Sequence, residues 1–87
     1  MTFLEKHVEK QQNKVIDKAL EELLELSQVL ITYKNKSTLD KEHLLDEMAD
    51  CTIMIEQLRI LFYIDVKDIS VKLAYKLDKL KRGDFIG

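Results

Sequence analysis

Proline is absent from this chain of 87 residues, and glycine occurs only twice, as Gly83 and Gly87. Because these two residue types are the strongest helix breakers, their scarcity allows long helices through most of the chain. The single cysteine, Cys51, excludes an internal disulfide and fits a reducing compartment. Residues 1–12 contain no apolar segment typical of a signal peptide. We therefore expect a cytoplasmic protein.

A strong excess of one charge and a long hydrophobic run are also missing. The net charge of −2 disfavours binding to nucleic acid, since proteins that bind polyanions usually carry a basic surface. The longest apolar stretch, 51–64, is interrupted by Glu56 and Arg59, and it is shorter than the about 20 residues that a membrane-spanning helix needs. We expect neither nucleic acid nor membrane among the partners.

Apolar residues recur at helical spacing along almost the whole chain. The first predicted helix is capped by Thr2 and ends near residue 12, and the second runs from about 13 to 33. Residues 34–37 are the clearest turn in the sequence.

The second half of the chain predicts two more helices. One begins at Thr38 or Asp40, either of which is a good cap, and ends near residue 64. The last is capped by Asp65 and ends at Gly83. The sequence thus predicts a single all-α domain, 1–87, a bundle of about four helices whose two long central helices are antiparallel.

The third helix indicates an oligomer. Between residues 51 and 64 its apolar side chains cover most of the circumference, and a helix that is apolar all round has to be buried all round. A domain of this size buries a modest share of its surface alone. We expect a homodimer or homotetramer to complete the bundle, although a central helix in a monomer would show the same pattern.

A split acidic motif is the strongest functional signal. Glu21, Glu22 and Glu25 form EExxE on the second helix, and Glu47 and Asp50 form ExxD on the third. Residues three or four apart share a helical face, so an antiparallel pair can aim these carboxylates at one point. Such oxygen donors suit Mg²⁺, with Mn²⁺ as a possible substitute. The alternative is a set of solvated acids on exposed helical faces.

Other candidate groups give weaker signals. Lys72, Lys76 and Lys79 share one side of the last helix, with Arg82 one turn further on, and they could meet phosphates or be an ordinary lysine-rich surface. His7 and His43 lack the spacing of a His or Cys metal site. Cys51 is expected in the core rather than as a nucleophile.

These residues resemble the MazG-like all-α nucleoside triphosphate pyrophosphohydrolases, of the short bacterial and phage type. The resemblance is carried by the two acidic half-motifs, by the flanking segments 16–20 and 53–58, and by the terminal pattern 75–82. One position departs from it, because Val15 stands where the short members often have glutamine.

The resemblance implies a Mg²⁺-dependent hydrolysis of (d)NTP to (d)NMP and pyrophosphate. It also assigns roles, in which the metal is held by four residues, Glu22, Glu25, Glu47 and Asp50. Glu21 supports the metal or orients the attacking water, and Lys72, Lys76 and Arg82 meet the phosphates. The alternative is a non-catalytic helical module that binds nucleotide or a partner and is a degenerate relative of the family.

Overall fold

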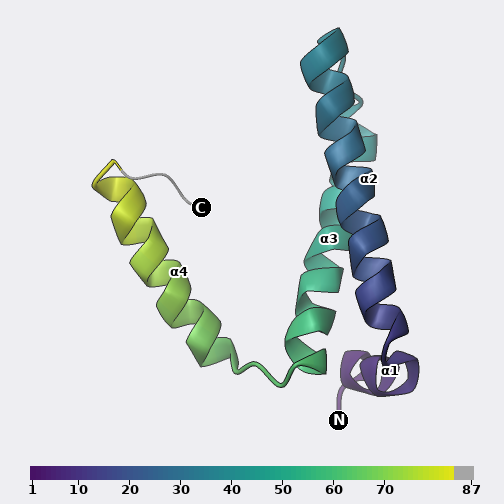
Figure 1. The fold of residues 1–87 in the computed structure, drawn as a ribbon, viewed down its shortest axis with the longest axis vertical. Coiled ribbons are helices and arrows are strands. Elements are labelled where there is room, and N and C mark those ends of the chain that lie inside the picture. Colours follow the sequence, from purple (N-terminus) through teal and green to yellow (C-terminus); the bar gives the residue numbers. More distant parts are fainter. Residues whose placement is uncertain (84–87) are drawn as a thin grey trace.

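The computed structural model describes residues 1–83 and contains four α-helices there (Figure 1). They are α1 (Phe3–Gln11), α2 (Lys14–Lys36), α3 (Lys41–Leu61) and α4 (Val66–Lys81). No strand occurs among these residues. The prediction of an all-α protein with about four helices is confirmed.

Three of the helices begin at the residues that the sequence predicts. Thr2 forms a capping box with Glu5, in which the Glu5 amide donates to Thr2 Oγ1 at 3.1 Å and the Thr2 amide donates to Glu5 Oε1 at 2.9 Å. The carboxylates of Asp40 and Asp65 each accept a backbone N–H from the first turn of α3 and α4, at 3.1 and 2.9 Å. Of the two caps considered for α3, Asp40 is therefore the one used, and Thr38 is not.

Helix ends in this chain rely on non-glycine residues with positive φ. Gln12, Ser37 and Tyr63 have φ of 47°, 56° and 55°, a region that costs an ordinary residue free energy. Gly83, with φ of 91°, follows α4 as predicted.

Two predicted boundaries are wrong. Residues 34–36 stay helical because lysine is a good helix former, so the turn is 37–40, and α3 ends at Leu61 rather than near residue 64.

The core lies where three helices meet. Helices α2 and α3 run antiparallel side by side, as predicted, and α1 crosses one end of the pair (Figure 1). The buried cluster consists of Val8, Val15, Ala19 and Met54. The partly buried Leu58, Ile60 and Leu61 pack against it. This small core holds the two long helices in the register that positions the site.

Helix α4 is splayed away from the other three (Figure 1) and contributes no buried residue. Its apolar stripe, formed by Val66, Ile69, Leu73, Leu77 and Leu80, is largely in solvent, with Leu73 55% and Leu77 54% exposed. The radius of gyration is 15.6 Å, whereas a compact chain of this length would have about 12 Å. Within the described residues, no helix combines the length and the apolar character needed to cross a membrane.

Candidate metal centre

The two acidic half-motifs come together at the middle of the α2–α3 pair. One carboxylate oxygen from each of Glu22, Glu47 and Asp50 lies within 4.8 Å of the others. Glu21, Glu22 and Glu25 form a second group that meets the same limit. Because Glu22 belongs to both groups, it is the centre of an acidic cluster that contains all five residues predicted from the sequence.

Two members of this acidic cluster are buried. Glu22 is 6% exposed and Glu47 is 7% exposed, while Glu21, Glu25 and Asp50 are open to solvent. The Oε2 atoms of Glu22 and Glu47 are both buried and have no hydrogen-bond partner among the described residues. Leaving a buried polar atom unpaired costs about 1–3 kcal/mol, and more when the group is charged. Both buried carboxylates of the cluster therefore have one oxygen that no described residue pairs with.

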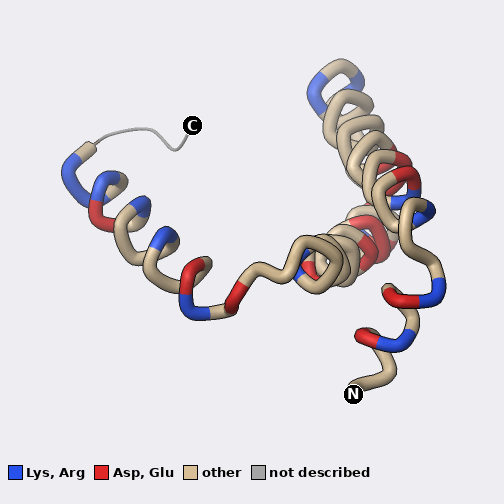
Figure 2. The backbone as a smooth tube through the Cα atoms, turned by 60° about the horizontal axis from the view of Figure 1, so that its bottom comes forward, with Lys and Arg blue, Asp and Glu red and all other residues tan. Residues whose placement is uncertain are grey.

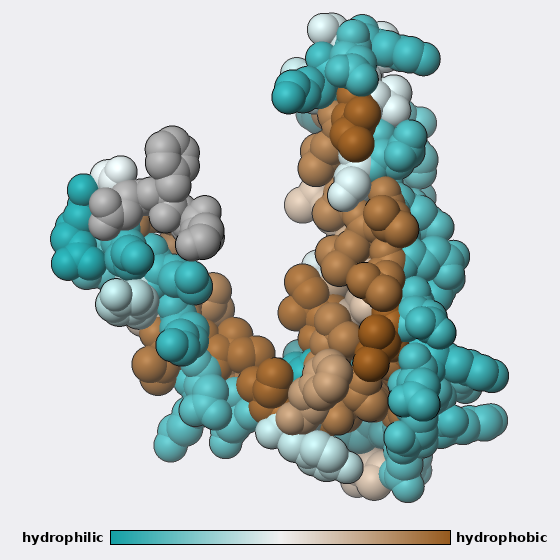
Figure 3. Space-filling model, in the orientation of Figure 1, coloured by the Kyte–Doolittle hydropathy of each residue, from teal (hydrophilic) through white to brown (hydrophobic). Residues whose placement is uncertain are grey.

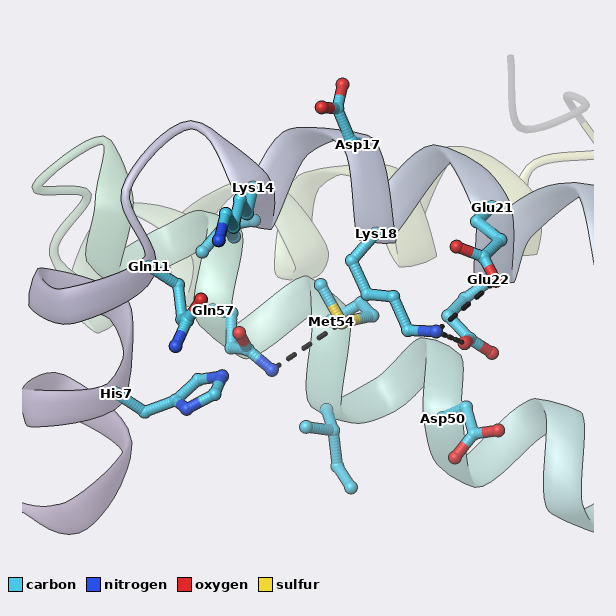
Figure 4. Close-up of a pocket in the computed structure, with 12 residues that line it drawn as sticks. His7, Gln11, Lys14, Asp17, Lys18, Glu21, Glu22, Asp50, Met54 and Gln57 are labelled. Atoms are coloured by element: carbon cyan, nitrogen blue, oxygen red, sulfur yellow. Dashed lines mark hydrogen bonds and ion pairs between the residues drawn. The ribbon is translucent and has the colours of Figure 1, made fainter.

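Lys18 is the cation that the structure places on this cluster. Its Nζ lies 3.2 Å from Glu22 Oε1 and 3.3 Å from Glu21 Oε1 (Figure 4). The hydrogen bonds to Glu22 and then to Glu21 raise the pKa of Lys18. No role was predicted for Lys18 from the sequence. Lys18 lies four residues before Glu22, one helical turn away, and this spacing is the sequence feature that could have predicted the ion pair.

His43 occupies the equivalent position beside the second buried acid. Its Nε2 lies 3.4 Å from Glu47 Oε1, again one helical turn away. The contact is an ion pair when the imidazole is protonated. His43 therefore lies beside the acidic cluster, although the sequence offered no metal-ligand spacing for it.

Cys51 lies directly beneath the acidic cluster. Its Sγ donates a hydrogen bond of 3.5 Å to the backbone carbonyl of Glu22, which joins α3 to α2 at the site. Burial, followed by the negative charges of Glu22 and Glu47, raises the pKa of the thiol. Since the thiolate is the nucleophilic form, a raised pKa lowers the share of that form. The prediction of a core cysteine is confirmed.

Two pockets flank the acidic cluster. The first, called here the α1 pocket, has a volume of about 540 Å³, and Glu22 and Asp50 line it together with residues of α1. The second, called here the turn pocket, has a volume of about 740 Å³, and Glu25 and Glu47 line it next to the α2–α3 turn. Both volumes lie in the range of about 300–1,000 Å³ that is typical of small-molecule sites. The carboxylates can therefore be reached from both sides.

The predicted phosphate-binding residues are not brought to the acidic cluster within one chain. Lys72 and Lys76 lie on α4 and Arg82 directly follows it, and Figure 2 shows the basic segments of this part of the chain far from the acidic segments of α2 and α3. Arg82 contacts Asp78, with 3.6 Å between Nη2 and Oδ2. The lysines that do line the α1 pocket are Lys14 and Lys18.

The chemistry of the donor set fits a hard divalent cation. The converging atoms are carboxylate oxygens, which Mg²⁺ and Mn²⁺ prefer, and the nearby Cys51 sulfur is engaged with a backbone carbonyl. The two unpaired Oε2 atoms are carboxylate oxygens removed from water, and pairing with a cation would offset the cost of burying them. Glu22, Glu25, Glu47 and Asp50 are the residues that could hold it.

Replacing Lys18 with Met should strengthen the binding of Mg²⁺. The change removes an ammonium group that pairs with Glu21 and Glu22, and exposed ion pairs are worth about 0.2–1 kcal/mol. We therefore expect the dissociation constant for Mg²⁺ to fall by about 1.4- to fivefold, as measured by calorimetry. Lys34→Met, an exposed change at the far end of α2, is the control. Weaker binding in Lys18→Met would contradict competition between the ammonium and the metal.

Comparisons with known proteins found no match for this chain among protein-family models, curated proteins or solved structures.

Proposed function

We propose that this chain is a Mg²⁺-dependent nucleoside triphosphate pyrophosphohydrolase. Water attacks the α-phosphorus of a (d)NTP, the bond between the α- and β-phosphates breaks, and the products are (d)NMP and pyrophosphate. The observation that carries the proposal is the convergence of Glu22, Glu47 and Asp50, with two buried carboxylate oxygens left unpaired. The resemblance of the split acidic motif to the MazG-like enzymes supplies the reaction.

Each part of the acidic cluster has a role in this proposal. Glu22, Glu25, Glu47 and Asp50 hold Mg²⁺, for which Mn²⁺ can substitute. The bound metal supplies Lewis-acid stabilisation of the charge that develops on the phosphates. Glu21 is exposed at the edge of the α1 pocket, where it can orient the attacking water and accept its proton.

Detecting pyrophosphate in a screen of the eight common NTPs and dNTPs tests the reaction. We expect (d)NMP and pyrophosphate in equal amounts, dependent on Mg²⁺ or Mn²⁺. Release of orthophosphate would contradict the proposed bond cleavage. Nucleotide binding without any turnover would instead support the alternative, a non-catalytic helical module related to these enzymes.

The exposed surface supports a homo-oligomer, either a dimer or a tetramer. The chain has 7363 Å² of accessible surface, whereas a folded monomer of 10.2 kDa would have about 5,300 Å². The excess of roughly 2,000 Å² is larger than the about 800 Å² that each partner buries in a standard interface. A second copy can cover an area of this size.

The distribution of apolar side chains supports a second copy as the partner. Figure 3 shows apolar surface on α4 and on the α2–α3 pair, facing the space between them. The exposed apolar residues of these helices include Leu73 and Leu77 on α4 and Ile55 on α3. A symmetric arrangement would bury the α4 stripe of each copy against the other copy. It would also provide a route for the basic side chains of α4 to reach the partner's acidic cluster.

Lys76→Ala tests whether α4 contacts the phosphates. If Lys76 meets the β- or γ-phosphate of the substrate, the change should lower kcat/KM for a triphosphate. The loss should correspond to about 2–4 kcal/mol of transition-state stabilisation, the range for one charge-stabilising contact. Binding of a monophosphate product should change much less. Lys67→Ala, on another side of α4, is the control. Equal and small effects of the two changes would show that the α4 lysines form an ordinary solvated surface and do not contact the phosphates.

Mixing two inactive variants tests whether the site is shared between chains. Mixed dimers of Asp50→Asn and Lys76→Ala chains contain one site with both changes and one with neither. If α4 serves the partner's acidic cluster, remixing should restore about a quarter of wild-type activity, because half of the dimers are mixed and each has one intact site. No recovery, with mixed dimers present by native mass spectrometry, would contradict a shared site.

A further inference from the structure

The α1 pocket has two chemically different ends (Figure 4). At one end are Glu22 and Asp50 of the acidic cluster, and at the other are His7 and Gln11 of α1 with Gln57 of α3. Apolar side chains form the wall between the two ends, among them Val15, Ile53 and Met54. The pocket therefore joins the candidate metal centre to a group of neutral hydrogen-bonding side chains.

Gln57 is the most unusual residue at the far end. It is 7% exposed, yet its carboxamide makes one hydrogen bond among the described residues, from Nε2 to the Met54 sulfur at 3.5 Å. A thioether is a weak acceptor, and a carboxamide offers two N–H donors and a carbonyl acceptor. Among the described residues, the buried side-chain atoms without a partner are those of Glu22 and Glu47 and not those of Gln57, so the carbonyl oxygen of Gln57 is open to the pocket and available to a ligand. The pocket beside it is where such a ligand would bind.

Helix α1 brings two more polar groups to this end. The positive φ of Gln12 ends α1 and changes the direction of the backbone before α2 begins. As a result α1 crosses the end of the α2–α3 pair and forms one side of the pocket. Gln11 and His7 are partly buried there. The His7 ring stacks on Phe3, with 6.3 Å between the ring centres. These groups provide both donors and acceptors.

We propose that this end of the α1 pocket binds the base of a nucleotide whose phosphates lie at the acidic cluster. A nucleobase is planar, fits between apolar walls, and carries neighbouring donors and acceptors on its edge, which a carboxamide can pair with in bidentate fashion. Gln57 is the residue that reads this edge, and Gln11 and His7 complete the contacts. This inference rests on the proposed function for the position of the phosphates.

The test compares nucleotides with an analogue that has no base. Affinities of the eight common (d)NMPs and of ribose 5-phosphate are measured by calorimetry with Mg²⁺ for the wild type and for Gln57→Leu. In the wild type we expect at least one (d)NMP to bind at least tenfold more tightly than ribose 5-phosphate. In Gln57→Leu we expect this advantage to shrink at least fivefold, while the affinities for ribose 5-phosphate and Mg²⁺ stay the same.

Two further variants separate this pocket from the alternatives. Gln11→Leu, on another helix, should also reduce the advantage, and it serves if Gln57→Leu does not fold. Gln28→Leu is the matched control because Gln28 lines the turn pocket. Loss of the advantage in Gln28→Leu alone would place the base in the turn pocket and overturn the inference. A Gln57→Leu chain with altered thermal stability and an unchanged advantage would show that Gln57 is structural, which overturns it as well.

The same measurements keep this inference distinct from the proposed reaction. If nucleotides bind with the expected advantage but no triphosphate is hydrolysed, the base pocket is supported and the proposed function fails. If triphosphates are hydrolysed but no (d)NMP binds better than ribose 5-phosphate, the base pocket is wrong and the proposed function stands.

Discussion

Replacing Asp50 with Asn, or Glu22 with Gln, is expected to lower kcat/KM for the best nucleoside triphosphate by at least about 100-fold. Each change keeps the shape of the side chain but removes a negative charge from the acidic cluster, where oxygens of Glu22, Glu47 and Asp50 converge. The effect should be largest for Glu22, which belongs to both groups of the cluster. Steady-state kinetics at saturating Mg²⁺ measures it.

The same changes should leave the fold intact. Removing one of several mutually repelling carboxylates relieves like-charge repulsion, so thermal stability without metal should be unchanged or higher in Asp50→Asn. In Glu22→Gln, loss of the ion pair with Lys18 offsets this gain, and thermal stability should change little. Asp46→Asn is the matched control, because Asp46 is an exposed acid of α3 outside the cluster and its replacement should preserve activity. Wild-type turnover in Asp50→Asn or Glu22→Gln would show that the acidic cluster is not the catalytic centre.

Replacing Leu73 with Lys is expected to convert the oligomer into monomers in which the core of α1, α2 and α3 stays folded. Leu73 is 55% exposed in the single chain and lies on the apolar stripe of α4, which contributes no buried residue within the chain. The change should therefore act on association rather than on the core. An unpaired charge in an interface costs about 3–5 kcal/mol, so the dissociation constant should rise by at least about 100-fold. Sedimentation at micromolar concentration measures it.

Val71→Lys is the control for this change. Val71 is also exposed on α4, at 68%, but it lies on the opposite side of the helix from Leu73. Its replacement should leave the oligomer in place. The expectation of an oligomer is wrong if the wild-type chain sediments as a folded monomer of 10.2 kDa.

Local signals made much of the fold predictable. Thr2, Asp40 and Asp65 cap their helices through hydrogen bonds to residues two or three positions away, and such short-range chemistry is readable from sequence. The end of α2 was not predicted, because Ser37 adopts a left-handed conformation for which a serine gives no warning. The position of α4 was not predicted either. Helical periodicity predicts that an apolar stripe is buried, but it does not predict which surface covers that stripe.

The acidic cluster was predictable because two i,i+3 pairs on antiparallel helices meet when the turn between them is short. What periodicity could not give was the burial of Glu22 and Glu47, which depends on how closely α2 and α3 pack. Gln57 was missed for a related reason. It is a polar residue three positions from the buried Met54, and its burial depends on α1 crossing the end of the helix pair.

The splayed α4 has a consequence for how the protein responds to its own abundance. A helix of 16 residues that contributes no buried residue to the chain is marginally stable in water, so its folding is linked to assembly by mass action. If α4 also completes the partner's site, dilution would remove helix and catalysis together. Specific activity would then fall as the chain becomes scarce, and a doubled supply of the chain would more than double the output.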